Sequence, residues 1–507
     1  MSMYDVIIIG AGLGGLTAGA KLAKEGKKIL LVEQQDKVGG CATVFHRKKN
    51  MTFETGLHEI DGLDEQDMKR GILSDLGVLD HVEFVRVPEF YRFLKGDVDV
   101  VVPNRVPDAI EAITMAFPSE AQAIQTYFRD LMDLRGQVKR IQWPRWKKIL
   151  AGPIYLLLIR KLITFQKMTV GEYFDSLSAN DLLKIAVCAN VGYYHDDPYS
   201  LSMLYFGLAQ ISYYHGGYYI KGGSQTLSDY LAKIITDNGG EIVLNHLVTE
   251  IVTEDGKAIG IRYIRTHGKD TEEQLAFGNI IVANAAIPNV VNHLIPSLQH
   301  TEYQAIINTL KRSPSLFTIY LSFKDPVSSY LDNRYSTIVY DESAKTLHDI
   351  YEIEQSNDHT KKPFAIVDYA AIDSGINSED SYIGVISGVD YLENWEHLEE
   401  SAYRNKKNEI VEIYIKRLER RFPGITQHLA YTEMATPKTI QRYTLNPNGS
   451  VYGFAQTPDQ AGSSRIKQKD AYIDNLCYAS AWTFPGGGFT GAIESGYLCA
   501  IEILGAK

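Results

Sequence analysis

The sequence lacks the residues and runs that would fix a disulfide framework, a metal cluster or a membrane span. Only four cysteines occur in 507 residues, and no two of them form a CxxC pair. Isolated cysteines of this kind indicate neither a disulfide framework nor a metal site, and they suit a reducing cytoplasm. No apolar run reaches the roughly 20 residues that a spanning helix needs. We expect no signal peptide either, because the first strand begins only a few residues into the chain.

Positive charge is also in short supply. Lysine and arginine together number 51 against 62 aspartates and glutamates, so the formal net charge is −11. A chain with this charge is not built to attract nucleic acid. The hydrophobic fraction of 45% and the charged fraction of 22% are typical of a soluble globular protein. The length favours two domains over a single core.

The N-terminus carries the strongest pattern that is present. The apolar residues 6–9 lead into a glycine-rich turn, and an Ala/Leu/Lys-rich helix pattern follows over about residues 16–25. A second apolar run, residues 29–32, ends at Glu33. Strand, glycine turn, helix, strand and acid in this order are typical of a dinucleotide-binding βαβ unit.

The residues of this unit suit the parts of a dinucleotide. Gly10 permits the tight turn, Gly12 lets the backbone approach a pyrophosphate, and Gly15 lets the helix pack on the strand. The helix N-terminus then faces the phosphates with unpaired N–H groups. Glu33, eighteen residues after Gly15, is placed to bind a ribose hydroxyl. The glycines expected around the phosphates are Gly10, Gly12, Gly14, Gly15, Gly39 and Gly40.

Residues 135 to 170 differ from the rest of the chain. Nine lysines and arginines occur there without one acid, together with Trp143 and Trp146, and residues 149–159 are mostly apolar. Such a segment predicts an interfacial contact with a membrane, with cations at the headgroups and tryptophans at headgroup level. The alternative is a buried helix with a solvated basic flank. Nucleic acid is not expected as a partner, because no recognised binding fold surrounds the patch.

The second half of the chain indicates a further sheet and a second glycine-rich element. β-prone runs at 317–323, 364–369 and 382–389 predict a separate sheet, and a charged helix is expected over about 407–421. Near the end, a glycine loop at 485–488 opens a helix that runs to the terminus. The N-terminus of that helix can stabilise negative charge, such as that of a reduced flavin ring.

Three further stretches, 53–58, 436–453 and 483–492, complete a resemblance to flavoproteins related to amine oxidases. Within that superfamily the chain is similar to the branch of phytoene desaturases, carotenoid isomerases and retinol saturases. The resemblance implies FAD as cofactor and an α/β fold with a discontinuous Rossmann-type FAD-binding domain. It also implies a second, α+β substrate domain and a helical membrane-contact region. The expected division is 1–70, 215–300 and 450–507 for the FAD-binding domain, 71–214 for the helical part with its interfacial segment 135–170, and 301–449 for the substrate-domain sheet.

The resemblance also assigns cofactor contacts by position. Beyond the phosphate glycines and Glu33, it implies backbone contact of Val248 with the adenine. Gly491, Ala492 and Ile493 would cap the flavin ring edge. Many relatives carry an acidic residue shortly before the Pro-Gly loop. In this chain the corresponding residues are Ser480, Ala481 and Trp482, and none of them is acidic. Backbone N–H groups at Trp482 and its neighbours would then serve the ribityl and phosphate oxygens.

Only one dinucleotide fingerprint is present, because the glycine pairs at 216–217 and 222–223 do not fit a second one. We therefore expect no dedicated NAD(P)H domain, and redox chemistry belongs to the flavin. Glu54, His58 and Glu59 are acid/base candidates, because they fall in the loop expected near the isoalloxazine. The alternative is that Glu54 and His58 are structural hydrogen-bonding residues.

The resemblance implies an apolar polyene as substrate, a carotenoid or a retinoid, taken up by a cytoplasmic protein held peripherally on the membrane. Desaturation, saturation and isomerisation remain open, and the first two need an external electron acceptor or donor such as a quinone. Two other functions remain open: an amine oxidase-type flavoenzyme acting on a polar substrate, and a non-catalytic flavin-binding carrier.

Overall fold

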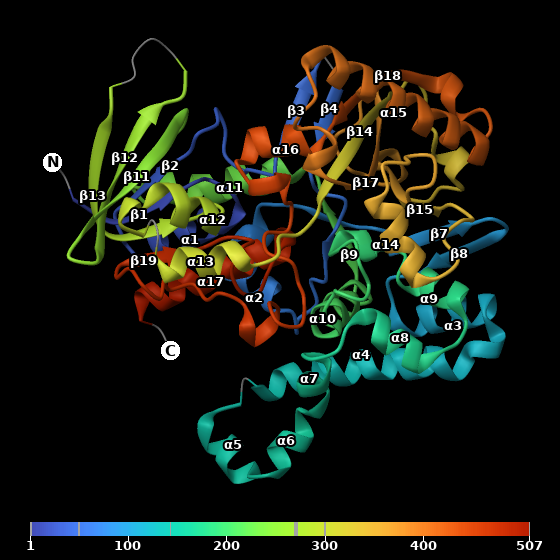
Figure 1. Ribbon diagram of the computed structural model, residues 1–507, viewed down its shortest axis with the longest axis horizontal. Coiled ribbons are helices and arrows are strands. Elements are labelled where there is room, and N and C mark those ends of the chain that lie inside the picture. Colours follow the sequence, from blue (N-terminus) through green and yellow to red (C-terminus); the bar gives the residue numbers. More distant parts are fainter. Residues whose placement is uncertain (1–2, 49–50, 142, 268–271, 299–300, 506–507) are drawn as a thin grey trace.

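The computed structural model describes residues 3–48, 51–141, 143–267, 272–298 and 301–505. Within these ranges two seven-stranded sheets lie side by side, with helices around both and a helical projection below them (Figure 1). The first sheet contains both the first and the last strand of the chain. The α/β class predicted from the sequence is confirmed.

The first sheet is built around β1 (Tyr4–Ile9), whose last four residues are buried. The strand order is β10, β2, β1, β13, β12, β11, and β19 pairs with β13. Their bounds are Glu241–Val243 (β10), Ile29–Val32 (β2), Gln274–Ala283 (β13), Lys257–Arg265 (β12), His246–Glu254 (β11) and Leu476–Tyr478 (β19). Strands β10, β2, β1, β13 and β19 pair in parallel, so their carboxyl ends share one edge, where such sheets bind ligands.

Three helices form a layer on this sheet: α1 (Leu13–Lys24), α11 (Ser224–Asp237) and α17 (Gly488–Leu504). α1 packs closely on α17, because a Cβ added at Gly496 would lie 2.2 Å from the carbonyl oxygen of Gly14. The two ends of the chain therefore share one packed layer. Short helices α2 (Met68–Asp75), α12 (Ile287–Asn289) and α13 (Glu302–Thr309) complete this half.

The second sheet has the order β18, β14, β17, β16, β15, β7, β8. The strands are Leu429–Ala435 (β18), Ser315–Phe323 (β14), Tyr382–Asp390 (β17), Phe364–Asp368 (β16), Ser336–Tyr340 (β15), Tyr91–Lys95 (β7) and Val98–Val102 (β8). Helix α15 (Glu400–Arg421) covers one face and buries Ile410, Tyr414 and Leu418 in the same core as β14. The other helices of this half are α14 (Leu347–Gln355) and α16 (Pro437–Thr444).

The second sheet is not confined to residues 301–449 as the resemblance implied. Strands β7 and β8 join its edge, with β7 parallel to β15, although they come from the stretch assigned to the helical part. Edge pairing is made through backbone hydrogen bonds, which local sequence does not encode. There are also two small sheets: β3 (Val44–Arg47) with β4 (Met51–Glu54), and β5 (Ile60–Asp61) with β9 (Gly217–Ile220) and β6 (Phe84–Arg86). Of these strands, only β6 comes from the stretch that the resemblance assigned to the helical part.

The helical part packs around a core that it shares with one edge of the second sheet and with α14, and one segment projects from it. The packed helices are α3 (Val106–Ala116), α4 (Ala121–Ile141), α8 (Val170–Leu177), α9 (Asp181–Val187) and α10 (Met203–Tyr213). Helices α5 (Arg145–Ala151) and α6 (Ile154–Leu158) extend away from the body, and α7 (Arg160–Phe165) returns to it (Figure 1).

The projection of α5 and α6 has an exposed apolar surface. Neither helix buries a side chain, and Leu150 is 81% and Leu157 69% exposed. The alternative of a buried helix in this segment is therefore wrong for α5 and α6. Among the described residues, no helix combines the length and the apolar character needed to cross a membrane.

Candidate functional site

The glycine turn after β1 has the conformation that the sequence predicts. Gly10 has a φ of +91°, in the region that favours glycine. A Cβ at Gly15 would lie 2.3 Å from the carbonyl oxygen of Gly10, so the helix can start this close to the strand only with glycine there. Helix α1 begins after Gly12, and no described side chain caps it. Its first N–H groups and positive dipole end are therefore open to an anion.

The second glycine pair and the acid lie against this turn. Gly39 donates its backbone N–H to the carbonyl oxygen of Ala11 at 2.8 Å. Glu33 is buried, and its carboxylate accepts hydrogen bonds from the backbone N–H groups of Ala11 at 2.6 Å and Gln35 at 2.9 Å. Burial raises the pKa of Glu33, and these N–H groups oppose that shift. The structure thus brings together Gly12, Glu33 and the pair Gly39–Gly40, which bridges to Gly12.

Val248 lies on β11, the strand that begins beside Glu33. The backbone N–H of His246 donates to the Glu33 carbonyl oxygen at 2.8 Å, and β11 has a register shift just after Val248. The Val248 side chain is buried in the core of the first sheet, so only its backbone is available to a ligand. This agrees with the backbone contact that the resemblance implied, which stays a prediction.

The C-terminal glycine loop leads into α17 with the same kind of uncapped start. No described side chain caps α17 at Gly487, and a Cβ at Gly491 would lie 2.2 Å from the carbonyl oxygen of Gly486. Ala492 is half-buried and Ile493 is buried in the core that also holds α1. The first turn of α17 therefore presents backbone N–H groups to the space in front of the loop.

Trp482 lies before this loop but faces the protein core. Its ring packs edge-on against Phe454 with the centroids 4.9 Å apart, and its Nε1 donates to Asn446 at 3.4 Å. Arg465, which the sequence analysis missed, holds the same segment by donating to the carbonyl oxygens of Phe454 at 2.7 Å and Ala481 at 2.9 Å. Burial lowers the pKa of Arg465 to about 10. A lone arginine far from any motif gives no signal in sequence.

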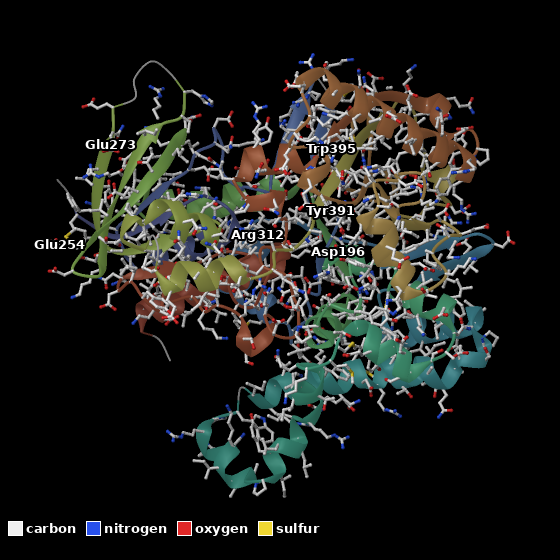
Figure 2. All side chains as sticks on the ribbon, viewed as in Figure 1. Asp196, Glu254, Glu273, Arg312, Tyr391 and Trp395 are labelled. Atoms are coloured by element: carbon white, nitrogen blue, oxygen red, sulfur yellow. The ribbon has the colours of Figure 1, made fainter. Side chains whose placement is uncertain are left out.

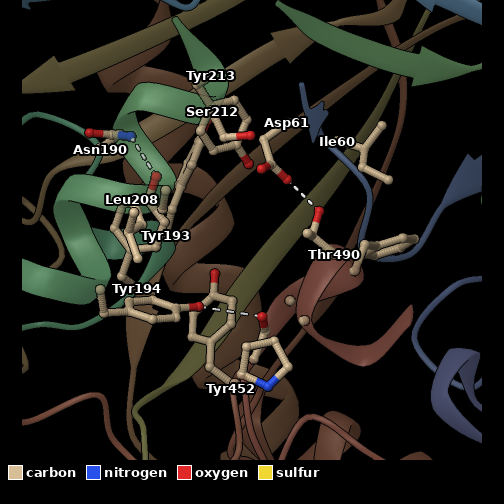
Figure 3. Close-up of a pocket in the computed structure, with 18 of the residues that line it drawn as sticks. Ile60, Asp61, Asn190, Tyr193, Tyr194, Leu208, Ser212, Tyr213, Tyr452 and Thr490 are labelled. Carbon is tan, nitrogen blue, oxygen red and sulfur yellow. Dashed lines mark hydrogen bonds between the residues drawn. The ribbon is translucent and has the colours of Figure 1, made fainter. Parts of the chain in front are cut away.

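A cavity of about 1090 Å³ lies between the two halves of the molecule, and the C-terminal glycine loop forms part of its wall. It is lined by residues 54–61, by α10 and by residues 484–491. Figure 3 shows part of this wall, where Thr490 of α17 donates to Asp61 and Tyr193, Tyr194 and Tyr452 surround the space.

The cavity reaches the surface beside helices α4 and α7. Ile141 and Ile163 line it and are themselves 47% and 43% exposed. Arg135 and Lys139 stand at the same place, so part of the basic segment forms the mouth. The tryptophans of that segment are not in the lining.

Glu54 is held in a structural network. Its carboxylate accepts from the Ser224 N–H at 2.8 Å and hydroxyl at 2.7 Å, and from the Leu57 N–H at 3.2 Å. Burial raises its pKa, and these bonds oppose the shift. With its acceptors engaged by the start of α11, Glu54 fits the structural alternative better than acid/base chemistry.

His58 lines the cavity as a neutral ring. Burial lowers its pKa to about 4. Its Nε2 lies 3.4 Å from the Ser387 hydroxyl, and its carbonyl oxygen accepts from Tyr335.

Glu59 differs from both neighbours. It is buried, it lines the cavity, and neither carboxyl oxygen has a hydrogen-bond partner among the described residues. Burial first, then the nearby carboxylates of Glu89 and Asp61, raise the pKa of Glu59 well above its usual value. This shift favours the protonated form of its carboxyl group.

The comparisons with known proteins agree with this geometry. A family model described as flavin containing amine oxidoreductase matches residues 13–504. The chain belongs to that family. The match begins at the first residue of α1 and spans the cavity and α17, so the cofactor is FAD. The open helix starts, the buried Glu33 and the glycine cradles fit its diphosphate, ribose and ring edge.

The relatives come from the polyene-acting branch. The chain is 24% identical to prolycopene isomerase of Daucus carota, over 99% of this chain and 80% of that protein. It is 24% identical to all-trans-retinol 13,14-reductase of Danio rerio, over 99% of this chain and 86% of that protein. It is 26% identical to the neurosporene-forming phytoene desaturase of Rhodobacter capsulatus, over 98% and 93%.

Solved structures share the fold. Cyclohexylamine oxidase of Brevibacterium oxydans superposes with a TM-score of 0.61 and 15% identity, covering 99% of each chain. At this identity the likeness concerns the fold alone. The predicted membership of the amine-oxidase-like superfamily is confirmed.

Proposed function

We propose that the protein is an FAD-dependent oxidoreductase acting on carbon–carbon bonds of an apolar polyene, a carotenoid or retinoid. The observation that carries this proposal is the cavity, which runs from the first turn of α17 to an apolar mouth between α4 and α7. FAD supplies hydride or electron chemistry when bound, and the protein supplies position and electrostatics. Desaturation, saturation and isomerisation all fit this arrangement; the first two use an external acceptor or donor of quinone type.

The proposal includes lipid as the source of the substrate and a peripheral, cytoplasmic location. A polyene that is insoluble in water has to leave lipid to reach the cavity. The projection α5–α6 exposes Trp146, Ile149 and Leu150 among lysines and arginines, and the cavity opens at its base. An apolar surface with flanking cations is the surface that an anionic bilayer binds.

Glu59 is proposed as the group that exchanges a proton with the substrate. Hydrogenation of a C=C bond needs a proton delivered to carbon and desaturation needs one removed, whereas isomerisation involves no net proton transfer. Glu59 lines the cavity, its carboxyl oxygens have no hydrogen-bond partner among the described residues, and burial raises its pKa well above the usual value. Acid/base groups with pKa values shifted by burial are typical of active sites.

The test is turnover of polyenes by the FAD-loaded protein. Phytoene, a cis-carotene and all-trans-retinol would be presented in liposomes, each with oxidised quinone or with a reductant, and the products separated by chromatography. We expect a change in bond order or geometry for at least one. No change in any of them would contradict the proposal. Hydrogen peroxide formed from a panel of amines would favour an amine oxidase, and flavin that no substrate reduces or reoxidises would favour a carrier.

A further inference from the structure

The wall of the cavity on the second-sheet side carries an acid that the proposed chemistry does not use. Glu354 is the penultimate residue of α14, and it lines the cavity together with Pro363, Phe364 and Val389. Helix α14 belongs to the second-sheet half, whereas α17 packs on the first sheet (Figure 1). Glu354 is 4% exposed, and among the described residues its Oε2 has no hydrogen-bond partner.

The one cation beside Glu354 Oε2 in the described structure is occupied elsewhere. Lys362, fully buried, lies with its Nζ 3.9 Å from Glu354 Oε2, beyond hydrogen-bond distance. That ammonium instead donates to the backbone carbonyl oxygens of Glu354 at 2.5 Å and Val389 at 3.3 Å. Burial raises the pKa of Glu354, and the charge of Lys362 opposes this.

The other buried acids nearby are satisfied within the protein. Asp196 accepts from the Tyr391 hydroxyl at 2.5 Å and from Gln355 at 2.9 Å (Figure 2). Asp390 accepts from the Trp395 indole at 2.7 Å. Glu354 therefore stands apart as the acid of this group that lines the cavity and has a carboxyl oxygen without a partner among the described residues.

A buried carboxyl oxygen that has no partner is destabilising, and a side chain that lines a cavity can gain a partner from a ligand that enters the cavity. The polar end of the ligand has to suit both the carboxyl and Lys362. A hydroxyl can donate to an ionised Glu354 or accept from a protonated one. A cationic amine would face Lys362, a carboxylate would face a second carboxyl group, and a hydrocarbon end would leave Oε2 unpaired.

We infer that Glu354 is the recognition site for a hydroxyl group at the end of the polyene. The inference rests on the proposed function and narrows its substrate class to a polyene alcohol. Such a substrate would enter with its hydroxyl first and leave its apolar end toward the mouth at Ile141 and Ile163. Anchoring one end fixes which carbon–carbon bond lies beside Glu59 and the flavin edge.

The test compares two ligands that differ only in the end group. All-trans-retinol and its deoxy hydrocarbon would be titrated into the FAD-loaded protein in detergent, and the dissociation constants measured by quenching of protein fluorescence. We expect the alcohol to bind about 10- to 100-fold more tightly than the hydrocarbon. Retinylamine and retinoic acid are expected to bind more weakly than the alcohol.

The variants test whether Glu354 is the cause. In Glu354→Leu the preference for the alcohol should disappear while the hydrocarbon binds at least as well. In Glu354→Gln, which keeps hydrogen-bonding groups, most of the preference should remain, and this variant covers the case in which the leucine variant does not fold. Glu352→Gln is the matched control, because Glu352 is exposed on the same helix and should leave both constants unchanged.

The outcomes separate the two proposals. If the alcohol and hydrocarbon bind equally to the wild-type protein, or if Glu354→Gln and Glu354→Leu both keep the full preference, the hydroxyl site is wrong and the polyene function stands. If none of these polyenes binds, both proposals are wrong. Loss of the preference in Glu352→Gln as well would trace it to α14 in general and would contradict the role of Glu354.

Discussion

Glu54 and Glu59 lie five residues apart in one loop, and their surroundings give them different roles. The start of α11 occupies the carboxylate of Glu54, whereas both oxygens of Glu59, a residue of the cavity lining, have no partner among the described residues. Sequence could propose both as acid/base candidates, because their position in the loop is readable. It could not separate them, because the partner of Glu54 is Ser224, which is 170 residues away.

Replacement of Glu59 by glutamine should remove proton exchange and leave the loop intact. We expect the turnover of a polyene to fall by about 10²- to 10⁴-fold, the usual contribution of a positioned acid or base. The flavin content and the melting temperature should stay near those of the wild-type protein. Glu54→Gln is the comparison: it should lose stability by about 1–3 kcal/mol through its weakened buried hydrogen bonds. Full activity in Glu59→Gln would contradict the proton-exchange role.

The neutral state of His58 makes stability depend on pH. Its pKa is about 4 in the folded protein and near 6.5 when exposed, so the unfolded chain binds the extra proton first. The free energy of unfolding is therefore unaffected by His58 above about pH 6.5. It falls by up to about 3 kcal/mol as the pH decreases from 6.5 toward 4. Urea unfolding of wild-type protein and His58→Gln at several pH values measures it. The two curves should diverge below pH 6.5; parallel curves would contradict the burial effect.

At the scale of single elements, the sequence predicted strands β1 and β2 and the glycine turn between β1 and α1. The run 29–32 is β2 as expected, and the helix after the turn starts at Leu13, slightly earlier than the pattern indicated. These elements are readable because buried parallel strands are apolar throughout and glycines mark the turn. Strand β7 and the position of Glu354 were not readable, because both depend on contacts between distant segments.

Position 14, in the first turn of α1, should accept only glycine. A Cβ at Gly14 would lie 2.1 Å from the carbonyl oxygen of Ala479 and would push α1 away from β19. We expect Gly14→Ala to lower the free energy of unfolding by more than about 2 kcal/mol and to weaken flavin binding. Gly136→Ala in α4, with nothing within 4 Å of the new Cβ, should be neutral or stabilising by up to about 1 kcal/mol. Thermal unfolding with flavin release measures both, and equal effects would be contrary to the packing described.

The projection α5–α6 should control binding to lipid. Changing Trp143, Trp146, Lys147 and Lys148 to alanine removes the aromatic and cationic groups that would meet headgroups. We expect co-sedimentation with anionic liposomes to fall by about tenfold or more, and wild-type binding to weaken as salt rises. A control variant with Lys233 and Lys416 changed to alanine, both exposed elsewhere, should bind as wild type. Binding that all variants share would remove the membrane proposal.

At the scale of the whole molecule, the predicted FAD site combines segments that are far apart in the sequence. The turn predicted to hold the phosphates leads into α1, the loop predicted to meet the ring edge leads into α17, and the two helices pack through Gly14 and Gly496. Hydrogen exchange should therefore slow in residues 10–24 and 488–504 together when FAD is added, because a ligand stabilises the state that binds it. Protection of one segment alone would show that the cofactor is held from one side.

The packing of α1 against α17 also sets an order for biosynthesis. Helix α1 (Leu13–Lys24) leaves the ribosome well before α17 (Gly488–Leu504), because nearly all the other described elements lie between them in the sequence. The apolar side of α1 therefore remains uncovered during most of translation. The nascent chain has to be kept from aggregating by chaperones or by temporary contacts until its final turns emerge, so a premature stop near residue 487 would leave a long polypeptide with its nucleotide cradle unfinished.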